Sequence, residues 1–120
     1  MNIQEISQNN VTIAHVTGEK VITDLNSGLD LLCEAAFGRR IKRIAIDKAS
    51  VTEDFFILST GLAGAVLEKF VQYGVKLAIY GDFSHYTSKP LRDFIRESNK
   101  GSSVFFVETE EEAIARLSKA

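Results

Sequence analysis

The stretch 75-VKLAIYGD-82 decides the fold class, because it is a short, mostly apolar run without strong alternation of apolar and polar residues. Two further runs of the same kind are 43-RIAID-47 and 103-SVFFVE-108. Runs like these are typical of strands that are covered on both faces, as they are in parallel sheets. We therefore expect three buried strands that run in the same direction.

Segments with helical spacing separate and follow these runs. In 24–37, apolar residues recur at intervals of three and four, with Asp24 or Asn26 as candidate caps and Cys33 on the predicted core face. Further helical patterns cover the residues after Gly61, after Ser88 and after Thr109. Ser88 is a predicted N-cap with a proline in the first turn, and Thr109 has capping-box spacing to a glutamate.

The N-terminal segment predicts a β-hairpin. Residues 2–8 and 11–16 alternate moderately, and Asn9-Asn10 lies between them. Asparagine tolerates positive φ, which a tight hairpin turn requires. We expect residues 1–120 to form a single α/β domain, with a mixed sheet in which an antiparallel hairpin precedes a parallel βαβαβ unit and helices pack on the sheet.

The charge composition of the chain limits the classes of molecule that it is expected to bind. Fourteen basic and sixteen acidic residues give a net charge of −2, which argues against nucleic acid. The basic cluster 39-RRIKR-43 is interpreted as the polar lead-in to a strand rather than as an anion patch. A single cysteine suits a reducing compartment, and neither a signal peptide nor a membrane-length apolar run is present. We expect a cytoplasmic protein without membrane contact.

The candidate site lies where the predicted parallel strands end, because ligands of open α/β sheets gather at the carboxyl ends of strands. These ends read 47-DKASVTEDFF-56, 81-GDFSHYTS-88 and 107-VET-109. The residues predicted to bind a ligand or partner are Asp54, Phe55, Asp82, Ser84, Tyr86 and Ser88. For Ser84 and Thr87 taken singly, local hydrogen bonds to the backbone are the alternative interpretation. Burial under the sheet edge is the alternative for Phe55 and its neighbour Phe56.

Known catalytic and cofactor motifs are missing from the sequence. His85 and His15 lack metal-ligand spacing, and GLAG at 61–64 matches no phosphate-binding loop. Ser59 lies outside a GxSxG elbow. We therefore predict no catalytic residue, no metal and no cofactor, and an enzymatic function ranks third among the hypotheses.

Four blocks of the chain carry a resemblance to a known family: DFFILSTGLAG, KLAIYGDFS, LRDFIRESNKG and FFVETEEEAI. Together they resemble an uncharacterised bacterial family, domain of unknown function 4180. A more distant resemblance is to the STAS domains of anti-sigma factor antagonists, which share the element order and a serine-rich turn before a helix. That resemblance implies phosphorylation by a partner kinase at Ser59, with Thr60 matching the second serine of the turn. The aspartate that precedes these serines in the antagonists is Leu58 here.

The sequence is compatible with two placements of Ser59. As an N-cap it would hold a phosphate at the positive end of a helix. Helical spacing also extends back to Thr52 or Asp54, which would put Ser59 inside the helix.

The leading functional hypothesis is a STAS-like, non-enzymatic regulatory domain that presents residues 52–60 and 82–88 to a protein partner. The alternative is a module that binds a small polar ligand or an anion at the same sheet edge. A second copy of the chain, giving a homodimer, is a further candidate partner.

Overall fold

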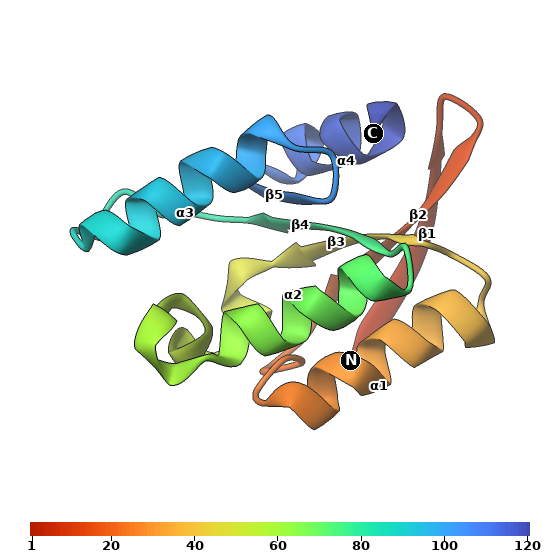
Figure 1. Cartoon of the computed structure of the whole chain (residues 1–120). Helices are drawn as coiled ribbons and strands as arrows, with labels where there is room; N and C mark the ends of the chain where they lie inside the picture. The colour runs from red at the N-terminus through yellow and green to blue at the C-terminus, as the bar shows by residue number, and fades with distance from the viewer.

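The computed structural model describes residues 1–120 and contains one five-stranded sheet in the order β1-β2-β3-β4-β5 (Figure 1). The hairpin strands pair antiparallel, and the other three neighbouring pairs are parallel. The predicted mixed α/β sheet is confirmed, and β2 also joins the parallel set, so that only β1 runs against the others. The strands are β1 (Asn2–Gln8), β2 (Val11–Thr17), β3 (Arg43–Asp47), β4 (Lys76–Tyr80) and β5 (Val104–Val107).

The predicted hairpin turn forms at the two asparagines. Asn9 and Asn10 have φ values of 55° and 65°, and the register places Gln8 opposite Val11. Two successive positive φ values are what a two-residue hairpin turn needs to match the twist of its strands. The local sequence therefore favours this turn, and the Asn9 amide also donates to the Ser118 hydroxyl at 3.3 Å.

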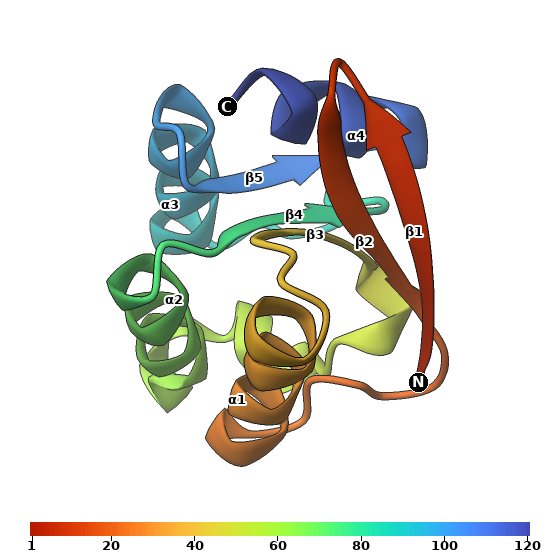
Figure 2. The ribbon, with the colours of Figure 1, turned by 90° about the vertical axis from the view of Figure 1, so that its right-hand side faces the viewer.

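Four helices cover the sheet unequally (Figures 1 and 2). Three of them, α1, α2 and α3, pack with one face of the sheet, whereas α4 packs alone on the other. None of them has the length and apolar character that a membrane span needs. Their bounds are α1 (Leu25–Cys33, continued by a π turn at Glu34–Gly38), α2 (Leu62–Gln72), α3 (Lys89–Lys100) and α4 (Glu110–Lys119).

Burial on both faces explains why the strands lack an alternating pattern. Ile44 and Leu77 belong to the larger core under α1 and α2, while Ala45 and Ala78 belong to the smaller core under α4. Successive strand residues point to opposite faces, so both kinds of position must be apolar. The near-continuous apolar runs in the sequence follow from this arrangement.

Three helix starts agree with the sequence-based caps. Asp24 accepts a hydrogen bond from the backbone nitrogen of Ser27 and forms a capping box with it. Ser88 caps α3 and Thr109 caps α4, each accepting from the backbone nitrogen three residues further on. Each cap satisfies an orphan donor at the helix start and fixes where the preceding connection ends.

The core position predicted for Cys33 is wrong, because its side chain is exposed. The buried stripe of α1 contains Gly28, Leu31 and Leu32, which lie toward α2. A Cβ at Gly28 would lie only 3.1 Å from a methyl group of Val66, so this glycine lets the two helices approach closely. The close approach centres the buried stripe on Gly28 and turns Cys33 toward solvent.

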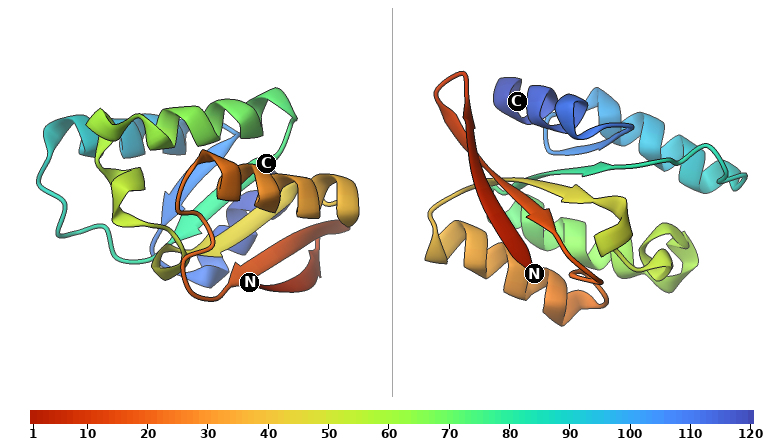
Figure 3. Two further views of the ribbon diagram at one scale, coloured as in Figure 1. Left: turned by 90° about the horizontal axis from the view of Figure 1, so that it is seen from below. Right: turned by 180° about the vertical axis from the view of Figure 1, so that it is seen from behind.

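The free edge of β5 is covered by a side chain of α3. The Asn99 amide donates to the carbonyl of Phe106 at 3.0 Å and accepts from its backbone nitrogen at 2.8 Å. One asparagine thus satisfies both edge groups of that residue in place of a further strand. Figure 3 shows α3 lying along this side of the sheet.

Candidate functional site

Two long connections leave the carboxyl ends of β3 and β4 and lie at the same end of the sheet, at the left of Figure 1. The first runs through residues 48–61 as three short 3-10 turns, and the second covers residues 81–88. Connections between strands and helices usually have about two to six residues, and longer ones are commonly functional. The sequence predicted that these two segments lie close together, and the contacts between them show that they do.

The connections are joined by three side chains, which we call the Lys48–Glu53–Tyr86 clasp. The Tyr86 hydroxyl donates to Glu53 Oε2 at 2.8 Å, and Lys48 Nζ donates to Glu53 Oε1 at 3.0 Å. Lys48 Nζ also lies 5.1 Å from the centroid of the Tyr86 ring. One carboxylate therefore binds both connections through its two oxygen atoms.

The clasp shifts the ionisation of its members. Burial raises the pKa of Glu53, but the hydrogen bonds from Lys48 and Tyr86 lower it by more, so its pKa lies below the usual value. Burial lowers the pKa of Lys48, but its hydrogen bonds with Tyr86 and Glu53 outweigh that effect and raise it. Burial is also the main reason that the pKa of Tyr86 is raised. At neutral pH the clasp is a lysinium–carboxylate pair with a neutral phenol.

Gly81 lets the two strand ends come together. A Cβ at this position would lie 2.7 Å from the Cβ of Lys48, and the residue has a φ of +156°. Both the contact and the backbone angle disfavour any side chain. The glycine at the end of β4 is therefore part of what positions Lys48 for the clasp.

An aromatic cluster lies beneath the clasp. The ring of Phe56 stacks on Tyr86 with centroids 5.5 Å apart and also contacts Phe55, Phe83 and Phe106. Phe55 and Phe56 are only 1% and 3% exposed, which confirms the burial interpretation for both. A 3-10 turn at Glu53–Phe56 directs both rings inward, so the predicted binding residue Phe55 lies in the core and not at the surface.

A groove of about 420 Å³ lies between the two connections. Five of its ten lining residues are hydrophobic, and one of these, Ile57, is 50% exposed. Ile57 adjoins the other apolar residues of the lining, so the groove offers apolar contact surface and not a single exposed side chain. The lining includes Ile57, Ser59, Tyr86, Ser88, Pro90 and Leu91.

The predicted site residues divide into two groups. Tyr86 and Ser88 line the groove, although Ser88 also caps α3. Asp82 instead accepts from the backbone nitrogen of Ser84 at 2.8 Å and from its hydroxyl at 2.6 Å. These bonds from Ser84 lower the pKa of Asp82 and agree with the local-bonding interpretation of that serine. Asp54 is exposed on the same end of the molecule but does not line the groove.

Ser59 neither caps an α-helix nor lies inside one, so both predicted placements are wrong. It lies in a 3-10 turn at Leu58–Thr60, and Gly61, with a φ of 79°, precedes the first turn of α2. The Thr60 hydroxyl lies 2.8 Å from the carbonyl oxygen of Asp54 and 2.9 Å from that of Ile57, so it holds the turn together. Ser59 is left exposed on the groove rim.

The sequence did not identify Lys48 and Glu53 as site residues, although both lie in the segment 47–56 that follows β3. Their pairing depends on the path of the 3-10 turns, and no periodic pattern in the sequence predicts that path. The available signal was Gly81 directly after β4, since a glycine at a strand end indicates a close approach by another segment.

A second polar cluster lies at the same end of the sheet but under α4. His15 Nε2 lies 2.6 Å from the Tyr80 hydroxyl and 3.6 Å from Glu110 Oε1. Burial, with the negative charges of Asp47 and Glu110, raises the pKa of Tyr80 to about 12. The phenol is therefore neutral and serves as a packing partner of the histidine. No group of three or more His, Cys, Asp or Glu side chains is arranged to hold a metal ion.

Residues 8–117 match the model of the family described as a domain of unknown function, DUF4180. The chain belongs to this family. The family membership predicted from the four sequence blocks is confirmed, and the DUF4180 region includes both connections, the clasp and the groove. No curated protein and no solved structure matches the chain.

Proposed function

We propose that this DUF4180 domain is a non-enzymatic regulatory domain that binds a protein partner in the groove between its two long connections. The observation that carries the proposal is the contact between these connections, which leaves Ile57 half exposed beside an apolar groove floor. Exposed apolar surface beside a hollow supplies the anchoring position that protein interfaces use. The hydrogen bonds of Lys48, Glu53 and Tyr86 to one another suit a scaffold that shapes the groove.

The charges around the groove define the chemistry of the partner. Asp54 and Asp82 are exposed acidic residues on the two connections, whereas Glu53 is paired with Lys48. Charge complementarity steers association and favours partners of opposite charge. The expected partner segment carries an apolar side chain for the groove and basic residues beside it.

Ser59 gives this surface a means of control. A phosphate would add roughly 1.5 to 2 negative charges. Beside an apolar groove, this charge would oppose the docking of an apolar side chain. The likeness to anti-sigma factor antagonists supports the same direction of control, in which phosphorylation weakens partner binding.

The test compares two substitutions of similar exposure. Ile57 is 50% exposed on the groove, and Val71 is 55% exposed on the distant end of α2. A partner captured from the native cell by the wild type is purified, and its affinity is measured by calorimetry. Ile57→Glu is expected to weaken binding by about tenfold or more, because it places a charge where an apolar contact forms.

Val71→Glu is the matched control and should bind as the wild type does. Equal affinity of the wild-type and Ile57→Glu proteins for the partner would show that the partner does not bind in the groove. Loss of binding in both variants would show that added negative charge alone is responsible.

Phosphorylation is tested on the same complex. Ser59→Asp should weaken partner binding, whereas Ser59→Ala should preserve it. Mass spectrometry of the protein from its native cell should find phosphate on Ser59 in at least one growth state. An unmodified serine under every condition would retire this part of the proposal.

A further inference from the structure

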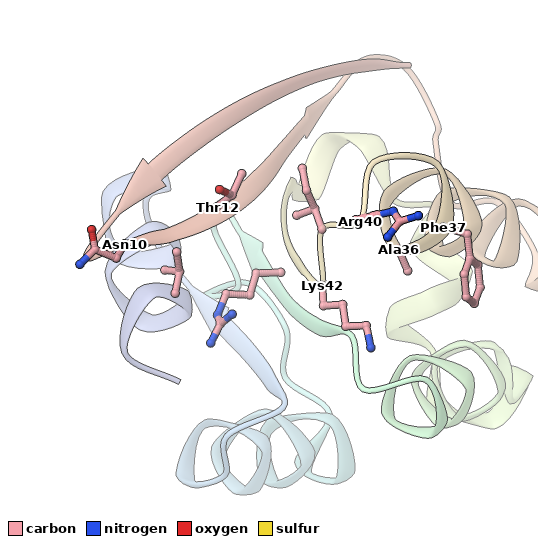
Figure 4. A pocket seen from close by; sticks show the side chains of 9 residues that line it. Asn10, Thr12, Ala36, Phe37, Arg40 and Lys42 are labelled. Atoms are coloured by element: carbon pink, nitrogen blue, oxygen red, sulfur yellow. The ribbon is translucent and has the colours of Figure 1, made fainter.

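A larger hollow, of about 700 Å³, lies at the opposite end of the sheet, where β2 and β3 begin. Figure 4 shows that Phe37 and Arg40 come from the end of the first helical segment and the loop behind it, that Lys42 precedes β3, and that Asn10 and Thr12 come from the hairpin. The hollow is thus built from segments far apart in the sequence. We call it the basic hollow because Arg40, Lys42 and Arg43 all line it.

Two positive charges of the basic hollow have no acidic partner. Glu5 and Glu34 are both held by Arg39, at 3.0 Å and 3.6 Å. Arg40 and Lys42 take part in no salt bridge. The Arg43 guanidinium is held in place by backbone oxygens of Leu117 and Ala120, at 2.9 Å and 3.0 Å, so the unpaired charges of the hollow are those of Arg40 and Lys42.

The backbone around Arg40 takes two uncommon conformations. The helical segment ends in a π turn at Glu34–Gly38, a geometry that is rare and often found at functional sites. Arg40 has a φ of 59°, the left-handed conformation that glycine or asparagine adopts more readily. Uncommon backbone conformations of non-glycine residues cluster at functional sites, so the conformation of Arg40 marks this loop as a candidate site.

An exposed aromatic ring borders the basic hollow. The Phe37 side chain is 62% exposed and meets Tyr73 edge to face, with centroids 5.9 Å apart. An edge-to-face contact fixes the tilt of the Phe37 ring and leaves it accessible. A planar group of a ligand can therefore stack there, as nucleobases do on aromatic side chains.

From these observations we propose that the basic hollow binds a phosphorylated ligand of the mononucleotide class. Arg40 and Lys42 would bind the phosphate, Arg43 would add positive potential, and Phe37 would contact the base. Guanidinium groups suit phosphate because their donors can bind two oxygens at once. The volume falls in the range of about 300 to 1,000 Å³ that is usual for small-ligand sites. This site is separate from the groove of the proposed function and does not depend on it.

The experiment is an NMR titration of the ¹⁵N-labelled chain with four mononucleotides, AMP, GMP, CMP and UMP, and with the corresponding nucleosides and inorganic phosphate as probes that lack one half of the ligand. At least one mononucleotide should shift the amide signals of Phe37, Arg40 and Lys42. Its affinity should exceed that of its own nucleoside and of phosphate by about tenfold or more, because each probe keeps only one of the two contacts.

Arg40→Gly separates binding from folding. Glycine adopts the left-handed conformation without strain, so this variant should melt no lower than the wild type while it binds the mononucleotide at least about tenfold more weakly. Arg92→Ala, which removes an exposed arginine from α3, is the control for loss of one positive charge and should bind normally.

Three results would overturn the proposal: no response to any of the mononucleotides, an affinity of the mononucleotide that binds equal to that of its own nucleoside, or unchanged binding by Arg40→Gly. Ile57→Glu should bind the mononucleotide normally, and Arg40→Gly should bind the protein partner normally. The two sites can therefore fail independently.

Discussion

The two ends of the parallel strands differ in how their polar side chains are used. At the carboxyl end, Glu53 binds both Lys48 and Tyr86, and Asp82 binds Ser84. At the amino end, Arg40 and Lys42 have no acidic partner. Polar groups that hydrogen-bond to one another hold a surface in a fixed shape, whereas charges without a partner remain available to bind a ligand. The difference suggests a shaped docking groove at one end and an anion site at the other.

The largest contrast between the two ends is expected from their phenylalanines. Phe56 is 3% exposed within the aromatic cluster, and Phe37 is 62% exposed beside the basic hollow. Phe56→Ala should lower the free energy of unfolding by about 3 to 5 kcal/mol, because it removes a buried ring and leaves a cavity. Phe37→Ala should cost less than about 1 kcal/mol. Urea unfolding of both variants checks the contrast, and equal losses would break it.

A smaller but still large effect is expected at Gly81. Alanine there would place a Cβ 2.7 Å from the Cβ of Lys48 and would strain a φ of +156°. We expect a loss of about 2 kcal/mol or more, from the clash and the backbone together.

Gly64 in α2 is the matched control for Gly81, since a Cβ at Gly64 would meet nothing within 4 Å. Gly64→Ala should stabilise the protein by about 0.5 kcal/mol, because alanine favours the helix. Opposite signs for the two glycine substitutions in thermal or urea unfolding would support the close approach at Gly81. A neutral Gly81→Ala would contradict it.

The smallest expected effect is on how the stability of the protein depends on acidic pH. The pKa of Glu53 is lower in the folded chain than its usual value of 4.5, so its carboxylate favours folding at neutral pH. This contribution is fully present above pH 4.5 and should disappear as the pH falls through the folded-state pKa below it. Because Glu53 is 59% exposed, the effect should be below about 1 kcal/mol.

Unfolding measured between neutral and acidic pH should show a flatter dependence for Glu53→Gln than for the wild type. Glu97→Gln, which changes an exposed glutamate of α3, is the control and should leave the dependence largely unchanged. A wild-type profile for Glu53→Gln would mean that the clasp contributes no stability in solution.

Local sequence predicted the features that local physics determines. The asparagine pair specified the hairpin, and Ser88 and Thr109 specified two helix starts. The apolar runs predicted strands buried on both faces. Because the parallel strands end at the same edge of the sheet, the sequence also predicted that the two connections lie close together. In each case the determining interaction lies within a few residues or follows from the direction of the strands.

Features that depend on the tertiary path could not be predicted in the same way. The Lys48–Glu53 pairing requires the 3-10 turns, and the exposure of Cys33 follows from the close approach of Gly28 to Val66. Likewise, nothing in the letters RRIKR shows that Arg39 is paired while Arg40 is left-handed and free. These outcomes are decided by which distant segment arrives beside each residue.

The contact between the two connections is the feature on which the proposed docking surface depends, and hydrogen–deuterium exchange of the wild type and Phe56→Ala tests it most directly. If residues 53–60 and 82–88 form one unit, the substitution should speed exchange in both segments while the hairpin at 2–17 stays protected. Faster exchange confined to residues 53–60, with an unchanged 82–88 segment, would show that the two connections move independently and would contradict the account.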